Sequence, residues 1–423
     1  MLKREDNELV TRVGPDTPMG NALRRYWMPA LLSEQLPHAD SDPLRVPLLG
    51  EDLIAFRDSD GQIGLLQNNC PHRGASLFFG RNEEAGLRCV YHGWKFDVAG
   101  RCIDMPNEPA ESDFKHKVSA VAYPCQELAG VVWTYMGPPE TMGPIPDQEW
   151  MRLPLGSVWI SKTLQECNYL QAIEGGVDTS HSSFLHRDFS PSGGPLGTSG
   201  YRTRSTAPRL EVLVTDYGYR YASVRHIKDE DKDYVRVYQF VMPFHQMRSF
   251  EGYEPGRATV QGHMWVPIDD ENCWVFNWMY ARDGQPIAAD IFLHEEAMFG
   301  RGPADLLPGY KTKANRDNDY LIDRNLQRTR NYTGIQGVNT QDMAVQESMG
   351  AIYDRTKEHL GSADTAVIAT RRLLMQAAKD VQEGKLPPGS RPGTVSQVRP
   401  AEMVLPHGTA WAEAMQPELV ARW

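Results

Sequence analysis

The sequence predicts an α+β protein with a small all-β domain followed by a larger domain, in which helices flank an antiparallel sheet. Short apolar segments separated by turns fill residues 42–137, a pattern typical of a small β-domain. Longer alternating segments mixed with helical patterns occupy residues 157–335, as expected for one antiparallel sheet with local helices. Residues 340–383 have the spacing of helices, and we expect an extended arm from residue 386 onward.

Three domains follow from these patterns. Residues 1–41 are predicted to form a helical segment that packs on the larger domain, because apolar residues recur at intervals of four between Leu23 and Leu31. The small β-domain covers residues 42–137. A stretch rich in Pro and Gly opens the larger domain, at residues 138–423.

The bulk composition excludes several classes of protein. The 423 residues carry a formal net charge of −11, whereas a nucleic-acid surface is basic. The six cysteines have no framework spacing, so we expect free thiols in a reducing compartment. The start of the chain lacks the apolar core of a signal peptide, and no run of about 18 apolar residues exists. We therefore expect a cytoplasmic protein with no membrane or nucleic-acid partner.

Four potential metal ligands lie in the stretch Cys70–Cys102, as the pairs Cys70-x-His72 and Cys89-x-x-His92. Each pair precedes a glycine, so each can lie on a tight turn, and two loops are expected to project side by side. Two thiolates and two imidazoles can hold zinc. They can also hold one [2Fe–2S] cluster in the Rieske arrangement, in which two His replace two Cys on one iron.

The residues that flank the two pairs favour the iron–sulfur cluster. They resemble the Rieske signature closely: Pro71, Arg73, Gly74, Tyr91, Gly93 and Trp94. A Rieske protein that only transfers electrons would not need the residues that follow the β-domain, nor a second metal site among them.

That second site is indicated by Asp178, His181 and His186, in the pattern D-x-x-H-x4-H. On an ideal helix the two His would diverge by roughly 140°, so both can bind one ion only if the helix is widened or broken there. The glycine pair before Asp178 makes such a break plausible. Two imidazoles and one carboxylate form the facial triad of non-haem Fe(II) oxygenases. The carboxylate is either Asp178, which is nearest, or Asp342, at the start of the helical tail.

The chain as a whole resembles the oxygenase component of Rieske non-haem iron ring-hydroxylating systems, and especially the phthalate dioxygenase-like group, which has only α-type subunits. The resemblance extends over nearly the whole chain, in these stretches: Arg24–Ala30, Cys70–Cys102, Glu174–His186, Asp216–Gly218 and Gln341–Arg355.

The resemblance implies a role for each candidate ligand. The [2Fe–2S] ligands would be Cys70, His72, Cys89 and His92, and the mononuclear Fe(II) ligands would be His181, His186 and Asp342. Asp178 would then be a bridge that receives the electron from a cluster His of a neighbouring subunit. Such a transfer implies a head-to-tail homotrimer, or a hexamer of stacked trimers.

The implied reaction inserts O2 into an aromatic carboxylate of the phthalate, isophthalate or 3-chlorobenzoate type and gives a cis-dihydrodiol. The chain has no G-x-G-x-x-G after a strand, hence no flavin or NAD site, so a separate NAD(P)H-dependent reductase must supply electrons. The alternative is a Rieske monooxygenase or O-demethylase that acts on a methoxybenzoate or phenoxybenzoate.

An arginine is the best candidate to bind the substrate carboxylate, because its planar fork matches a carboxylate. Of the arginines in the middle of the chain, we predict Arg209 and Arg248, where chain ends meet apolar strand residues. Residues 240–250 are apolar with few polar groups, which suits a pocket wall.

Overall fold

The computed structural model describes residues 1–109, 111–154, 156–189, 199–251, 257–391 and 393–422. The chain forms two compact units, of which the smaller comprises Val13–Met142. The larger comprises Met1–Arg12 and Gly143–Trp423. Of the predicted helical segment 1–41, only the first twelve residues therefore join the larger unit.

The rest of that segment belongs with the smaller unit, and its predicted helical stripe is wrong. Trp27–Leu32 form strand β1, which pairs antiparallel with β10 (Val131–Tyr135). All six side chains of β1 are buried, so the spacing of four was part of a continuous apolar run. Pro29 disfavours a helix interior and is tolerated at the register irregularity in this strand.

Three small antiparallel sheets build the smaller unit, in the orders β1-β10-β9, β2-β3-β4 and β5-β6-β7-β8. The remaining strands are β2 (Leu44–Leu48), β3 (Glu51–Arg57), β4 (Ile63–Gln67), β5 (Arg81–Glu83), β6 (Gly86–Arg88), β7 (Lys95–Phe96), β8 (Cys102–Asp104) and β9 (Cys125–Leu128). The unit also contains helix α2 (Pro18–Leu23). Cys70 and Cys89 belong to one buried apolar cluster with Leu77 and Phe96, so both thiols lie at the core.

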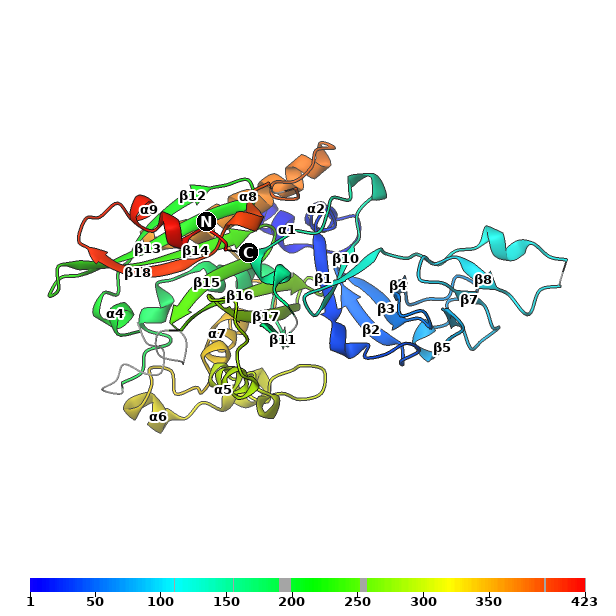
Figure 1. The fold of residues 1–423 in the computed structure, drawn as a ribbon, viewed down its shortest axis with the longest axis horizontal. Coiled ribbons are helices and arrows are strands. Elements are labelled where there is room, and N and C mark those ends of the chain that lie inside the picture. The colour runs from blue at the N-terminus through cyan, green and yellow to red at the C-terminus, as the bar shows by residue number, and fades with distance from the viewer. Residues whose placement is uncertain (110, 155, 190–198, 252–256, 392, 423) are drawn as a thin grey trace. The chain divides into compact units, whose positions relative to one another are not determined.

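An antiparallel sheet of eight strands forms the centre of the larger unit, as predicted (Figure 1). Its order is β11-β17-β16-β15-β14-β13-β12, and β18 also pairs with β14. The strands are β11 (Val158–Gln165), β12 (Arg209–Val214), β13 (Gly218–Ile227), β14 (Lys232–Val241), β15 (His245–Glu251), β16 (Ala258–Pro267), β17 (Cys273–Ala281) and β18 (Ala401–Pro406). The tail expected to be an extended arm thus contributes a strand to this sheet.

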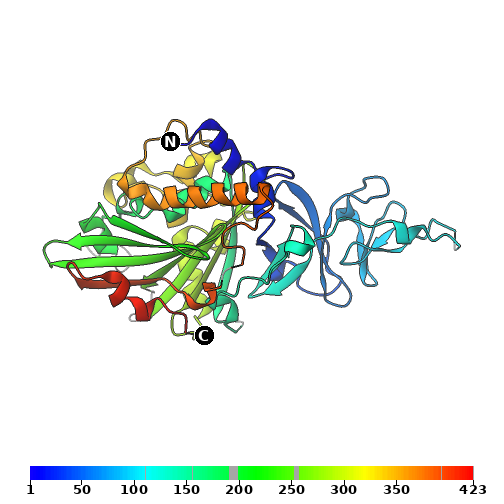
Figure 2. The same ribbon diagram turned by 90° about the horizontal axis from the view of Figure 1, so that it is seen from above.

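The larger unit also contains helices, several of which pack on the sheet. They are α1 (Arg4–Thr11), α3 (Tyr169–Val177), α4 (Ser199–Arg204), α5 (Ala289–Phe299), α6 (Arg324–Thr329), α7 (Val338–Glu347), α8 (Thr365–Gln382) and α9 (Trp411–Ala414). Figure 2 shows α8, in orange, running along the strands. The hydroxyl of Tyr219 in β13 lies 2.7 Å from that of Thr370 in α8. Trp411 of α9 packs with Ala222 and Val224, which occupy the opposite face of β13.

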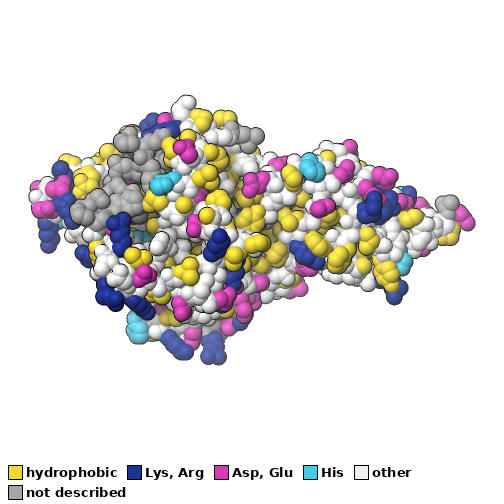
Figure 3. Space-filling model, turned by 90° about the horizontal axis from the view of Figure 1, so that it is seen from below, with side chains coloured by type: hydrophobic (Ala, Val, Ile, Leu, Met, Phe, Trp, Pro, Cys, Tyr) yellow, Lys and Arg dark blue, Asp and Glu magenta, His cyan; other side chains and the backbone are white. Residues whose placement is uncertain are grey.

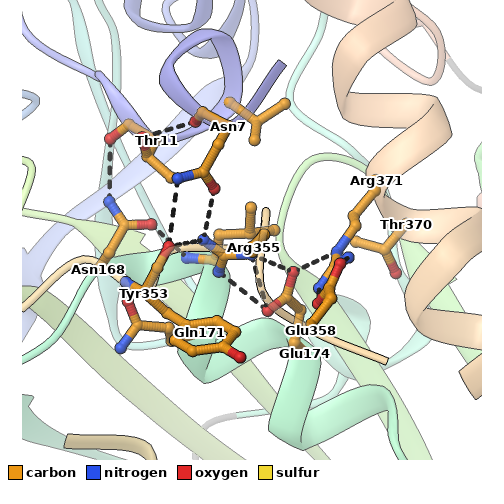
Figure 4. A network of polar contacts seen from close by, with 12 residues as sticks. Asn7, Thr11, Asn168, Gln171, Glu174, Tyr353, Arg355, Glu358, Thr370 and Arg371 are labelled. Atoms are coloured by element: carbon orange, nitrogen blue, oxygen red, sulfur yellow. Dashed lines mark hydrogen bonds and ion pairs between the residues drawn. The ribbon is translucent and has the colours of Figure 1, made fainter. Parts of the chain in front are cut away.

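Buried ion pairs hold α3 in place (Figure 4). Glu174 accepts hydrogen bonds from Arg355 at 2.9 Å and from Arg371 at 2.6 Å, and Arg371 also pairs with Glu358. Burial alone would raise the pKa of Glu174, but the two guanidinium groups outweigh burial and lower it. Removing one partner would leave a buried charge without compensation, which is strongly destabilising. This network fixes the helix that leads into the second candidate metal site.

On the face drawn in Figure 3, acidic and basic side chains of the described residues are intermingled. Among the described helices, none has both the length and the apolar composition needed to cross a membrane.

Candidate active site and metal centres

Two loops with the same hydrogen-bond pattern carry the four predicted cluster ligands. The amides of Cys70 and Cys89 each donate to the carbonyl five residues later, at 2.8 Å in both loops. The amides of Gly74 and Gly93 donate back to the carbonyls of these cysteines, at 2.9 Å in both loops. The two glycines have φ values of +76° and +80°, a conformation that costs glycine little. The predicted tight turns are confirmed.

The side chains of the two loops lie together. The ring centroids of His72 and His92 are 4.4 Å apart, and His72 stacks on Trp94 at 4.3 Å. Burial raises the pKa of the Cys70 thiol to about 11, and the nearby Cys89 adds to this shift. The donors are thus two buried thiols and two more exposed imidazoles. This set fits a Rieske cluster, in which one iron takes sulfur ligands and the other takes nitrogen ligands.

Three further predicted ligands converge in the larger unit. Nε2 of His181 lies 3.1 Å from Nε2 of His186, and Oδ1 of Asp342 lies 3.6 and 3.2 Å from these two atoms. Three donors about 2.1 Å from one ion and at right angles would be about 3.0 Å apart. Asp342 Oδ1 is buried and accepts no hydrogen bond from the described residues. The donor set therefore fits a divalent ion held by two His and one carboxylate.

The expected break in the helix brings the two His together. Helix α3 ends at Val177, and His181 begins a separate 3-10 turn that ends at Ser183. The chain changes direction at Asp178, whose backbone is extended. The two imidazoles can therefore face each other, which their spacing on a continuous helix would prevent.

The glycine pair before this break allows α3 to approach its neighbours closely. A Cβ on Gly175 would lie 1.9 Å from Nε2 of Gln346, in helix α7, which also carries Asp342. A Cβ on Gly176 would lie 2.0 Å from the ring of Trp265 in β16. Asp342 is more than 150 positions from the two His in the sequence. Its approach to them thus depends on Gly175 and Gly176, which have no side chain.

Each of the three converging side chains is held on its other side by a neighbour. The distances are 3.3 Å from Asp178 Oδ2 to His181 Nδ1, 2.8 Å from Gln341 Oε1 to His186 Nδ1, and 3.3 Å from Asn339 Nδ2 to Asp342 Oδ2. Such partners orient metal ligands and fix the tautomer of an imidazole.

Asp178 lies on the side of His181 opposite the converging nitrogens. Its Oδ1 accepts hydrogen bonds from the amide and hydroxyl of Ser180, at 2.7 and 2.8 Å. Burial would raise the pKa of Asp178, but the hydrogen bonds from His181 and Ser180 lower it to about 2. Of the two candidate carboxylates, the structure therefore brings Asp342, and not Asp178, to the shared side of the imidazoles.

A cavity opens onto these three donors. Alternate residues of β15 line it, and these are Gln246, Arg248 and Phe250 from the predicted pocket wall. The other large apolar side chains in the lining are Tyr238, Trp265, Val275, Phe299, Val338 and Met343.

The two predicted substrate arginines lie in different places. Arg248 is in the cavity, whereas Arg209 begins the edge strand β12, is 65% exposed, and pairs with Glu211. Arg209 therefore does not lie in the cavity, as the prediction that it binds substrate would require. Its position near a strand end does not tell which way the side chain points. The cavity holds Arg202 instead, which follows the glycine-rich segment after His186.

Known proteins resemble this chain over both units. Residues 26–124 match a model of the Rieske [2Fe-2S] domain, and residues 134–419 match one described as LigXa C-terminal domain like. The first match includes β1, in agreement with the boundary seen in the structure.

Several curated relatives cover most of the chain. It is 38% identical to the 3-chlorobenzoate-3,4-dioxygenase oxygenase subunit of Comamonas testosteroni, over 92% of each chain. It is also 38% identical to the phthalate 4,5-dioxygenase oxygenase subunit of Pseudomonas putida, over 91% of this chain and 88% of the relative. The 5,5'-dehydrodivanillate O-demethylase oxygenase subunit of Sphingobium sp. is 30% identical, over 92% and 83%.

Among solved structures, NdmA of Pseudomonas putida CBB5 with caffeine has the same fold. Its TM-score is 0.61 at 20% identity, over 86% of this chain and 94% of NdmA. With the Rieske loops and both domain matches in place, the chain belongs to the Rieske-type aromatic-ring-hydroxylating oxygenases, as an oxygenase subunit similar to those of the phthalate and 3-chlorobenzoate dioxygenases.

Proposed function

We propose that this chain is the oxygenase component of a dioxygenase that adds both atoms of O2 to the ring of an aromatic carboxylate and releases a cis-dihydrodiol. The substrates we expect are acids of the phthalate, isophthalate or 3-chlorobenzoate type. One observation carries this proposal: the cavity that contains the three converging ligands also contains two arginines that form no ion pair with any described acidic residue.

These two arginines are Arg202 and Arg248. Among the described residues Arg202 has no hydrogen-bond or ion-pair partner, and Arg248 has only a long hydrogen bond of 3.4 Å to Gln261. Burial lowers the pKa of both groups, that of Arg248 to about 10. The third arginine of the cavity, Arg236, lies 3.5 Å from Glu402. A buried cation without a partner is costly, so an anion that enters this cavity is favoured.

The remaining walls suit an aromatic ring. Phe250, Trp265, Val275 and Phe299 offer apolar surface that would hold the ring and exclude water. The arginines would hold the carboxylate and so orient the ring with respect to His181, His186 and Asp342. These three residues would hold Fe(II), which when bound supplies the O2 chemistry.

Electrons would come from a separate NAD(P)H-dependent reductase and enter at the cluster held by Cys70, His72, Cys89 and His92. We assign to Asp178 the transfer between subunits, in a homotrimer or hexamer. Its support is geometric: its carboxylate touches His181 and its side chain is 22% exposed, so a group of a neighbouring subunit can reach it. We place the enzyme in the cytoplasm.

A second candidate function is a Rieske monooxygenase reaction, either O-demethylation of a methoxybenzoate or monooxygenation of a phenoxybenzoate, because a relative with 30% identity is named an O-demethylase. The same apolar cavity with arginines would accept such an acid. Product analysis with labelled O2, a reductase and a panel of aromatic acids separates the two. A cis-diol with two labelled atoms supports dioxygenation, and loss of formaldehyde with one labelled atom supports demethylation.

A further inference from the structure

A second group of two His and one Asp lies in the larger unit, outside the cavity. It consists of His226, Asp233 and His407, and one ligand atom from each lies within 4.8 Å of the others. The catalytic group His181, His186 and Asp342 satisfies the same condition. No part of the proposed reaction uses the second group.

The fold explains why these three residues meet. His226 in β13 is the direct cross-strand partner of Asp233 in β14, and β18, which precedes His407, pairs with β14. By the alternation of side chains, His226 follows Ala222 and Val224 on the sheet face that packs against α9. The three residues therefore lie at the end of this row of apolar side chains, at the edge of the sheet face, where water can reach them.

The donor atoms converge on one carboxylate. Nδ1 of His226 lies 3.1 Å and Nδ1 of His407 lies 2.9 Å from the same oxygen, Oδ1 of Asp233. The ring centroids of the two His are 3.8 Å apart. Both contacts are hydrogen bonds to the carboxylate in this structure, and their lengths are close to the distance of about 3.0 Å expected between ligands of one ion.

The carboxylate is held firmly while the imidazoles remain accessible. Asp233 is 7% exposed, and its second oxygen accepts a hydrogen bond of 3.0 Å from the amide of Gly408. The side chains of His226 and His407 are 33% and 51% exposed. Two imidazoles, one fixed carboxylate and an open side toward water are the ligand set of a zinc-type ion that completes its shell with solvent.

We propose that His226, Asp233 and His407 bind a second divalent cation of the zinc type, distinct from the catalytic metal. Its ligands come from β13, from β14 and from the segment after β18. Binding therefore ties the carboxyl-terminal strand to the central sheet, and the ion stabilises the larger unit without taking part in turnover.

The test is equilibrium dialysis of the iron-loaded enzyme against Zn²⁺, with zinc and iron measured in each sample and melting followed in parallel. The variants are His226→Asn and His407→Asn, in which the amide can still donate a hydrogen bond to Asp233 but is no imidazole ligand. His359→Asn, at an exposed histidine elsewhere in the same unit, is the matched control.

We expect the wild-type enzyme and His359→Asn to bind one zinc beyond their full iron content, and zinc to raise their melting temperature. The affinity of the two test variants should fall by about 100-fold or more, because losing only a hydrogen-bond partner of a ligand already costs about tenfold to 100-fold, with iron content and cluster absorbance unchanged. Equal zinc affinity in all four proteins would overturn the proposal, as would zinc that binds only by displacing iron. If a variant fails to fold, Asp233→Asn provides the second test, with the same expected loss.

Discussion

The two candidate iron sites of this chain are built in opposite ways. The cluster ligands lie within 23 residues, on two loops that close with identical backbone hydrogen bonds. The candidate mononuclear ligands come from the segment after α3 and from α7, and they meet only because Gly175 and Gly176 allow close packing. The first site has its imidazoles toward the surface, whereas the second faces a cavity with two arginines that form no ion pair among the described residues. In the function we propose, the second site positions the substrate and the first receives electrons.

The largest effect should come from removing one mononuclear ligand. Asp342→Ala deletes one of three donors, so it should abolish mononuclear iron binding and turnover. The Rieske absorbance should remain, because the cluster ligands belong to the other unit. Metal analysis and visible spectra of the purified variant measure both. Bleaching of the cluster band would contradict the separation of the two sites.

The connection between the two sites is tested by Asp178→Asn. The amide has the same size as the carboxylate but cannot accept the same charge-assisted hydrogen bonds. We expect both metals to remain and turnover to fall by about 100-fold or more, which corresponds to about 3 kcal/mol in the barrier. Rapid-mixing absorbance should show normal reduction of the cluster but failed reoxidation by substrate and O2. Loss of the mononuclear iron would instead make Asp178 a ligand.

The dependence of the second site on packing is tested by Gly176→Ala. The new methyl group would collide with the ring of Trp265, so we expect a loss of about 1–3 kcal/mol in the stability of the larger unit, and weaker iron binding. Gly361→Ala is the control, because the nearest atom to its Cβ would be 3.8 Å away. Thermal melting followed by iron analysis measures both variants. Equal stability of the two variants would show that α3 can move to make room for the methyl group without loss of stability, which would contradict the need for glycine at this position.

Local features of the sequence were sufficient to predict much of this molecule. The two ligand loops and most strands of the large sheet depend on neighbouring residues, and both are found where expected. The helix predicted around Trp27–Leu32 was wrong. A strand with both faces buried is a continuous apolar run, and such a run also satisfies the spacing expected of a helix. Arg209 and Arg248 could not be separated, since only the register of β15 and the exposure of β12 reveal which one faces the cavity.

The central claim is that the cavity beside His181, His186 and Asp342 binds an aromatic carboxylate through Arg202 and Arg248. Its most direct test compares the binding of an aromatic acid with that of its neutral amide, in wild-type enzyme and in Arg202→Gln, Arg248→Gln and the exposed control Arg209→Gln. Each cavity variant should weaken binding of the acid by about tenfold to 100-fold, or ~1.5–3 kcal/mol for a charge-assisted hydrogen bond, and leave the amide nearly unchanged. The control should match the wild type. Equal losses for acid and amide, or an effect of Arg209→Gln as large as that of Arg248→Gln, would contradict the account.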